Sequence, residues 1–177
     1  MAIAIISMFC KIKKDFRNEI KFNKNFQQII TFYLFECPVD NKSCRKKYFD
    51  FYGISGVQGF AKLKKLLLSA SNTLKNNYYP CKSSELVDVF NKYDYIEKGT
   101  EYCIFLKTDE KNIIQSLFAA IRNALAHGSF RCQMLNKEKY YYFENWHNYK
   151  KAEVLLKEGT LIKWIETIKN FQEIAKD

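Results

Sequence analysis

The hydrophobic positions along the chain recur mostly at helical spacing. The segment FRNEIKFNKNFQQIITFYLFE predicts a first helix over about residues 16–36, which ends before Pro38 because proline cannot continue a helix. A second helix is expected over about 56–76, followed by a turn in NNYYPCKSS and a shorter helix from Ser84. The apolar stripe of the second helix contains Phe60, Leu63, Leu67, Ala70 and Leu74.

The clearest predicted helix begins after Thr108 and ends at Gly128. Thr108 is expected to cap its N-terminus, with Asp109 and Glu110 in the first turn, where the positive end of the helix dipole favours carboxylates. Gly128 can adopt the left-handed conformation that commonly ends a helix. The buried stripe of this helix contains Ile114, Leu117, Phe118, Ile121 and Leu125.

Residues rich in β-formers follow that helix. SFRCQML and KYYYFENW predict a hairpin with NKEK as its four-residue loop, and KAEVLLK can add a third strand. TEYCIFL, earlier in the chain, fits either a strand or a helix. Thr160 is expected to cap a last helix that buries Leu161, Trp164, Ile165, Ile168 and Phe171. The predicted fold class is mainly α, in one domain over 1–177: a helical bundle with a β-hairpin or small antiparallel sheet before the C-terminal helix.

Composition narrows the class of protein further. The chain is 47% hydrophobic and 16% aromatic with six Gly and two Pro, which is typical of a compact globular protein. Its six cysteines contain no CxxC pair, so we predict free thiols, no metal site and no cofactor. The N-terminal MAIAIISMFCKIKK lacks the features of a signal peptide, and its apolar run is too short to span a bilayer. We therefore expect a cytoplasmic protein with no membrane association.

The net charge of +10 comes entirely from the first half of the chain. Residues 1–82 contain 15 Lys and Arg against 5 Asp and Glu, whereas residues 83–177 contain 14 of each kind. The basic residues cluster at 11–17, 42–47 and 62–65. Such a field attracts a polyanion, and nucleic acid is the obvious candidate. The alternative is a lysine-rich surface that serves only solubility.

The candidate chemistry lies in SLFAAIRNALAHGSF. Arg122 and His127 are five positions apart, which separates them by about 140° around an ideal helix. Asn123 and His127 share one face, which continues backward through Ala120, Ala119 and Ser116. Because small side chains let another backbone approach closely, we expect this face to pack against a neighbouring helix.

Metal-free RNA cleavage needs the two functions that Arg122 and His127 offer. Imidazole accepts and donates protons at cellular pH, so His127 can handle the proton of the ribose 2′-hydroxyl or of the leaving oxygen. The guanidinium of Arg122 is a permanent cation suited to charge developing on phosphorus. The structural alternative is that His127 only stabilises the helix C-terminus and that Arg122 only extends from the edge of the buried stripe.

Arg122, Asn123 and His127 resemble the signature of the HEPN superfamily. In that signature an Arg, commonly followed by a polar residue, precedes a His by four to six intervening residues near the end of a long helix; four residues intervene here. The resemblance covers residues 108–146 and implies an HEPN-like helical bundle. The toxin branch paired with nucleotidyltransferase antitoxins carries a Tyr two places after the His, where this chain has Ser129.

The resemblance implies a metal-independent endoribonuclease that leaves a cyclic phosphate and acts in toxin–antitoxin or antiphage defence. His127 would handle the proton, Arg122 would contact the scissile phosphate, and Asn123 would orient one of them. RNA is the implied partner, with an antitoxin protein as a further one, and two copies would form a homodimer whose motifs face one cleft. The competing hypothesis is a non-catalytic dimeric module that binds nucleic acid or a protein partner through its basic N-terminal half.

Two features near the motif are less specific. Arg131 follows it closely and is a further candidate for RNA contact, although strand alternation leaves its direction open. Aromatic side chains in KYYYFENW can stack on unpaired bases, but strand packing is their commoner role. His147 has no identifiable partner in the sequence and is expected in a surface loop.

Overall fold

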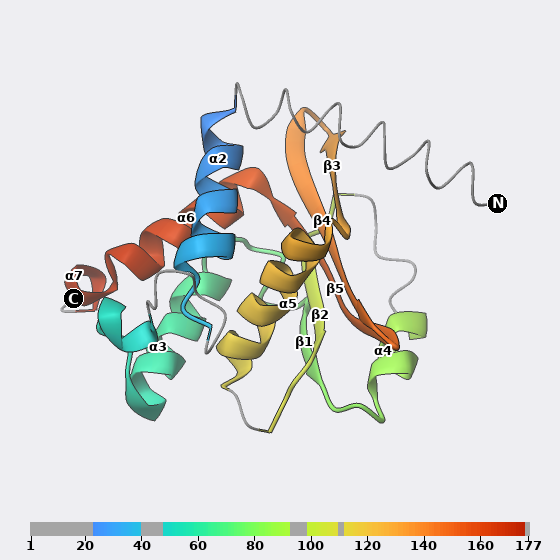
Figure 1. The fold of residues 1–177 in the computed structure, drawn as a ribbon, viewed down its shortest axis with the longest axis horizontal. Helices are drawn as coiled ribbons and strands as arrows, with labels where there is room; N and C mark the ends of the chain where they lie inside the picture. The colour runs from blue at the N-terminus through green and yellow to red at the C-terminus, as the bar shows by residue number, and fades with distance from the viewer. Residues whose placement is uncertain (1–22, 40–47, 93–98, 110–111, 176–177) are drawn as a thin grey trace.

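Five strands form one mixed sheet in the order β1-β2-β5-β4-β3 (Figure 1). A computed structural model of the protein describes residues 23–39, 48–92, 99–109 and 112–175. Strands β1 and β2 pair in parallel, and the other neighbours are antiparallel. The strands are β1 (Tyr78–Cys81), β2 (Tyr102–Leu106), β3 (Phe130–Leu135), β4 (Glu138–His147) and β5 (Tyr149–Lys157).

The predicted mainly α, HEPN-like helical bundle is therefore wrong, because the fold is mixed α/β. The three strands expected after the motif helix are present, but two earlier segments extend them into a five-stranded sheet. TEYCIFL contributes β2, and NNYYPCKSS, predicted as a turn, contributes β1. Pro80 misled the prediction: proline marks turns, but it is also tolerated in an edge strand such as β1, which pairs with a neighbour on one side only.

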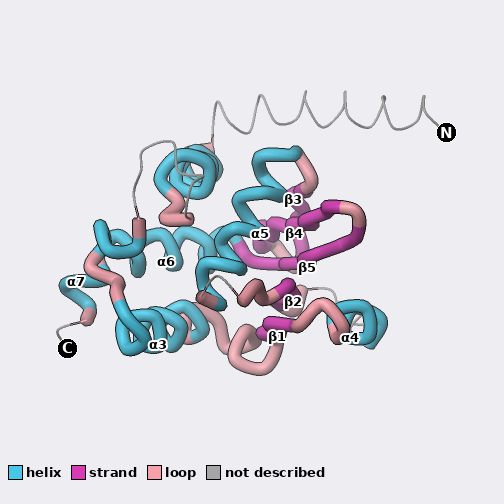
Figure 2. The backbone as a smooth tube through the Cα atoms, turned by 60° about the horizontal axis from the view of Figure 1, so that its bottom comes forward, coloured by secondary structure: helices cyan, strands magenta, loops and turns pink. Residues whose placement is uncertain are grey.

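The two faces of the sheet have separate hydrophobic clusters. The larger cluster joins the face of Phe105, Phe143 and Val154 to most of the helices, and the smaller one joins the face of Tyr142 and Leu155 to α4 (Leu86–Lys92). Figure 2 shows α5 and α4 on opposite sides of the strands. The helical elements of the larger cluster are α2 (Lys24–Ile30), η1 (Thr31–Glu36), η2 (Phe49–Tyr52), α3 (Gly56–Leu68), α5 (Ile113–His127), α6 (Glu158–Lys169) and α7 (Phe171–Ile174).

Helix α5 buries the predicted stripe and ends at Gly128, whose φ is +69°. Its start differs from the prediction. Asn112 caps the helix in place of Thr108, because the Asn112 side chain and that of Gln115 form a reciprocal capping box with each other's backbone. Glu110, predicted in the first turn, lies outside the described residues.

Other element ends also shift. The first helical region ends at Glu36, just before Pro38, as predicted, while residues 16–22 of that prediction lie outside the described range. Helix α3 ends at Leu68, so the predicted stretch to residue 76 is wrong; Leu74 is nevertheless buried in the turns that follow. Helix α6 begins at Glu158, so Thr160 lies inside it and is not its cap.

The turns between the last three strands are tight. Asn136 and Lys137 alone join β3 to β4, and both have positive φ, as in the type I′ turns that suit hairpins. The predicted four-residue loop NKEK is therefore wrong, because Glu138 already pairs with Leu135. Asn148, with a φ of +62°, joins β4 to β5. Within the described part of the chain, no helix is long and apolar enough to cross a membrane.

Candidate active site

A pocket of about 320 Å³ lies between the C-terminal half of α5 and the end of the β4–β5 hairpin. Both histidines of the chain line it, one from the helix and one from the hairpin. The complete lining is Arg122, Asn123, His127, Asn145, Trp146, His147 and Lys151. The pocket thus gathers imidazole, guanidinium, ammonium and amide groups at one point of the surface.

Helix α5 contributes the three residues of the sequence motif. Arg122 and Asn123 are half-buried about one turn before the end of the helix, and His127 is its exposed last residue. The helix ends in a Schellman arrangement, in which Gly128 N donates to Leu125 O over 3.2 Å and Ser129 N donates to Ala124 O over 2.8 Å. This ending turns the chain directly into β3 and leaves His127 at the mouth of the pocket.

A bulge in the β4–β5 pairing supplies the other half of the lining. Asn145 pairs with Ala152 and Trp146 pairs with Lys150, so Lys151 is the extra residue of β5. A bulge redirects the side chain at which it occurs and is common beside functional sites. Here it leaves Lys151 lining the pocket together with Asn145 and His147 of β4.

Arg122 has fewer partners than its five N–H donors can serve. Its Nη1 donates to Asn123 Oδ1 over 3.3 Å, while its buried Nε has no hydrogen-bond partner among the described residues. Burial raises the pKa of the Cys37 thiol, and the positive charge of Arg122 opposes part of that rise. The guanidinium therefore extends from the region of a buried thiol to the pocket, with donors available for a ligand.

The charged side chains in the lining are cationic. Among the described residues, no carboxylate forms an ion pair with Arg122 or with Lys151. Two cations that lack a carboxylate partner, beside two imidazoles, favour binding of an anion, and a guanidinium suits the oxygen geometry of a phosphate in particular. The described residues contain no cluster of three His, Cys, Asp or Glu side chains that could hold a metal ion.

A narrower groove continues from the pocket along α5. It has a volume of about 180 Å³ and shares Asn123, Asn145 and Lys151 with the pocket. The rest of its lining is Leu106, Thr108, Ser116, Ala119 and Ala120. The small-residue face of α5 was expected to pack against a neighbouring helix, but here it faces the sheet, and its small side chains leave this groove open.

Arg131, the further candidate for RNA contact, does not line the pocket. It pairs with Tyr142 across β3 and β4, and its guanidinium carbon lies 4.2 Å from the centre of the Tyr142 ring. Tyr142 belongs to the cluster on the α4 face, so Arg131 lies on the other side of the sheet from α5. Of the basic clusters, 11–17 and 42–47 lie outside the described residues, and 62–65 lies on α3, away from the pocket lining.

His147 is one of the pocket residues that sequence reasoning missed. It was expected in a surface loop, and it is the last residue of β4, two positions after Asn145. In a strand, residues two positions apart lie on the same face. A predicted strand that extended to residue 147 would therefore have placed His147 on the same face as Asn145. The sequence did not reveal that this end of the hairpin reaches α5.

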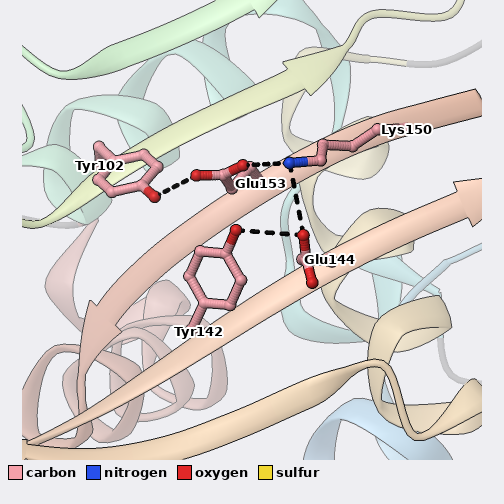
Figure 3. Close-up of polar contacts among 5 residues, drawn as sticks. All are labelled: Tyr102, Tyr142, Glu144, Lys150 and Glu153. Carbon is pink, nitrogen blue, oxygen red and sulfur yellow. Dashed lines mark hydrogen bonds and ion pairs between the residues drawn. The ribbon is translucent and has the colours of Figure 1, made fainter. Parts of the chain in front are cut away.

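A polar network occupies the opposite side of the same bulge (Figure 3). Lys150 lies 2.6 Å from Glu153 Oε2 and 3.4 Å from Glu144 Oε1. The Tyr102 hydroxyl donates to Glu153, and the Tyr142 hydroxyl donates to Glu144 over 3.2 Å. Burial alone would raise the pKa of Glu153, but the Lys150 and Tyr102 hydrogen bonds outweigh it and lower that pKa. Each carboxylate in this network therefore contacts the Lys150 ammonium and accepts a hydrogen bond from a tyrosine.

No family model, curated protein or solved structure matches this chain. The function therefore has to be inferred from the pocket itself.

Proposed function

We propose that the protein is a metal-independent endoribonuclease whose active site is the pocket at the end of α5. The observation that carries the proposal is that the only two histidines of the chain line one pocket with Arg122 and Lys151. Imidazole is the side chain best suited to proton transfer near neutral pH, and two of them can act as base and acid in one reaction. The two cations suit the phosphate on which that reaction takes place.

The proposed reaction is an internal transfer at phosphorus. One imidazole removes the proton of the ribose 2′-hydroxyl, and the 2′-oxygen bonds to the adjacent phosphorus. The bond from phosphorus to the 5′-oxygen breaks, and the other imidazole, in its protonated form, gives its proton to that leaving oxygen. Arg122 and Lys151 offset the charge on the non-bridging oxygens. The products are a 2′,3′-cyclic phosphate and a 5′-hydroxyl end.

Asn123 is assigned a positioning role. Its side-chain oxygen accepts the hydrogen bond from Arg122, and the residue lines both the pocket and the groove. It can therefore orient the guanidinium toward the phosphate, as the HEPN-like motif implies. The proposal rests on the pocket and uses that resemblance only for the roles of Arg122, Asn123 and His127.

A homodimer, which the resemblance implies, is a separate proposal. Because one chain supplies two histidines to one pocket, the reaction as written needs no residue from a second copy. The cleavage rate per chain, measured over a wide dilution series, distinguishes the two arrangements. A constant rate is expected for a site within one chain, and a rate that falls on dilution indicates that a second copy completes it.

The test of the proposed function is incubation of the purified protein with end-labelled RNA in excess EDTA. We expect cleavage, with products whose 3′ ends resist phosphatase until acid opens the cyclic phosphate. An otherwise identical strand carrying 2′-deoxyribose at every position should remain intact, because it lacks the attacking hydroxyl. Retardation of RNA in a gel without cleavage, weakening steeply with salt, would instead support the non-catalytic binding module.

A further inference from the structure

The groove along α5 adjoins the proposed phosphate site. Asn123, Asn145 and Lys151 line both the groove and the pocket, so a nucleotide whose phosphate contacts Lys151 can place its base in the groove. We propose that the groove binds this base, that Asn145 recognises the edge of the base through its carboxamide, and that the protein prefers a pyrimidine at this position of a single-stranded RNA. This inference rests on the proposed ribonuclease function.

Strand register directs the Asn145 side chain toward α5. Asn145 is the cross-strand partner of Ala152 and lies two positions after Phe143, and both of these residues belong to the hydrophobic cluster on the α5 face of the sheet. Alternation along β4 therefore places Asn145 on that face. The lining of the groove, in which Asn145 occurs together with Ala119 and Ala120 of α5, agrees with this direction.

The Asn145 carboxamide is available to a ligand. It makes no hydrogen bond to another residue in the described part of the chain. The other polar groups of the groove differ: the hydroxyls of Thr108 and Ser116 form a hydrogen bond of 3.3 Å with each other, and Asn123 accepts one from Arg122. A carboxamide offers an N–H donor beside an oxygen acceptor. Unpaired cytosine and unpaired uracil each present a donor beside an acceptor on their base-pairing edge, so the amide matches either base in one of its two orientations.

The size of the groove favours one ring over two. Its volume is about 180 Å³. A cavity of about 150 Å³ inside a protein holds a benzene ring. A pyrimidine is a single six-membered ring, whereas a purine consists of two fused rings. The groove is too small for a base pair, so the base that enters it has to be unpaired, which makes the substrate single-stranded.

The test confines cleavage to one phosphate. A 2′-O-methyl RNA strand with a single unmodified ribonucleotide has only one attacking 2′-hydroxyl. One set of strands carries each of the four bases on that ribonucleotide, and a second set varies the base that follows it. In EDTA, we expect the wild type to cleave strands with cytosine or uracil at one of these positions roughly 5- to 150-fold faster than strands with a purine there, the range for one base-specific contact.

Three variants test the role of the groove. Asn145→Ala should lower this preference several-fold, by slowing cleavage of the pyrimidine strands more than that of the purine strands. Ala119→Leu, which extends a side chain into the groove, should slow cleavage of every strand with a base at that position more than that of a strand without one. Gln133→Ala is the matched control and should keep the wild-type preference, because it removes a carboxamide from β3 whose partner, Tyr140, lies on the α4 face.

Binding separates this inference from the function on which it rests. The probes are fluorescein-labelled strands of the same sequences in which every nucleotide carries a 2′-O-methyl group, so that none can be cleaved, and anisotropy is measured at constant salt. Tighter binding of the pyrimidine probes that depends on Asn145, without cleavage of any RNA, supports the base site and overturns the ribonuclease. Cleavage with no pyrimidine preference, or with one that Asn145→Ala leaves unchanged, overturns the base site and leaves the ribonuclease standing. If the wild type neither binds these probes nor cleaves RNA, both proposals are wrong.

Discussion

Around the β4–β5 bulge, the two faces of the sheet differ in whether their lysine side chains form ion pairs. On the α4 side, Lys150 pairs with Glu144 and Glu153, and each of these carboxylates also accepts a hydrogen bond from a tyrosine. On the α5 side, one position further along each strand, Asn145 and Lys151 line the candidate active site. No described carboxylate forms an ion pair with Lys151.

From this contrast we expect adjacent residues to have different roles: those on the α4 face stabilise the fold, and those on the α5 face bind a ligand. Partly buried charges that are compensated and hydrogen-bonded, as in the Glu144–Lys150–Glu153 network, are typical of structural positions. Arg122 and Lys151 have no carboxylate partner among the described residues, so their place beside two imidazoles favours an anionic ligand. Variants on the α5 face should therefore change activity and not stability, and variants on the α4 face should do the reverse.

The largest effect is expected from the histidines. His127→Ala and His147→Ala should each lower the rate of RNA cleavage about 10²- to 10⁴-fold, the usual contribution of a general acid or base. Both side chains are exposed, so urea unfolding should give the same free energy as for the wild type within about 0.5 kcal/mol. If His147→Ala cleaves normally, the second imidazole is not part of the reaction and the α5 motif must act without it.

The combined removal of both histidines tests whether they act as one unit. For groups that serve the same reaction, the double variant should be little slower than the worse of the two single variants. Losses that multiply would mean that the histidines act in independent steps.

Arg122→Met is expected to lower the cleavage rate without lowering the free energy of unfolding. Loss of the guanidinium should slow cleavage about 10²- to 10³-fold, because it removes a cation that offsets charge in the transition state. The free energy of unfolding should be unchanged or higher by about 1 kcal/mol, since the variant no longer buries an Nε without a partner. Denaturant unfolding and cleavage rates measured on the same preparation check both halves. A loss of more than about 2 kcal/mol would show that Arg122 has a structural role.

Glu153→Gln tests the other face. It should lower the free energy of unfolding by about 1–3 kcal/mol, because Lys150 and Tyr102 lose a charged hydrogen-bond acceptor, and it should leave the cleavage rate within a few fold of the wild type. A loss of cleavage as large as that of the histidine variants would instead assign the network to the active site.

The pH dependence of unfolding gives an independent check on Glu153. Its pKa is lowered in the folded protein, so the stabilisation is present above the ordinary value of 4.5 and is lost as the pH falls through the folded-state pKa. The difference in stability between wild type and Glu153→Gln should therefore be constant from pH 8 to about 5 and shrink below that. The pKa of Lys150 is raised, so its own contribution should be lost only at alkaline pH, above its ordinary value of 10.5.

Sequence patterns predicted local structure well where one signal dominates. The α5 stripe and its end at Gly128 are confirmed, because a 3.6-residue period and a left-handed glycine act within a few residues of each other. The fold class was wrong because the identity of β1 depends on its pairing with β2, which is distant in the chain. No local pattern distinguishes Tyr78–Cys81 as an edge strand from the turn that Pro80 suggests.

The sequence motif identified only part of the candidate site. The motif identified Arg122, Asn123 and His127, all of which line the pocket. Lys151 and His147 were missed because they reach it through the bulge and the tight turn at Asn148, features of strand pairing that leave little trace in composition. The sequence left the direction of Arg131 open, since that direction depends on a register that only the β3–β4 pairing defines.

The smallest effect is expected at the turn between β3 and β4, at the far end of β4 from His147. Lys137 has a φ of +65°, which costs an L-residue more than it costs glycine, and asparagine followed by glycine is the preferred pair for this turn. Lys137→Gly should therefore raise the free energy of unfolding by roughly 0.5–1 kcal/mol. Cleavage should not change, because the turn and the pocket lie at opposite ends of the strand. A gain in stability that also alters cleavage would mean that the two ends of β4 are coupled, and the separation between structural and functional positions would then hold across the sheet but not along it.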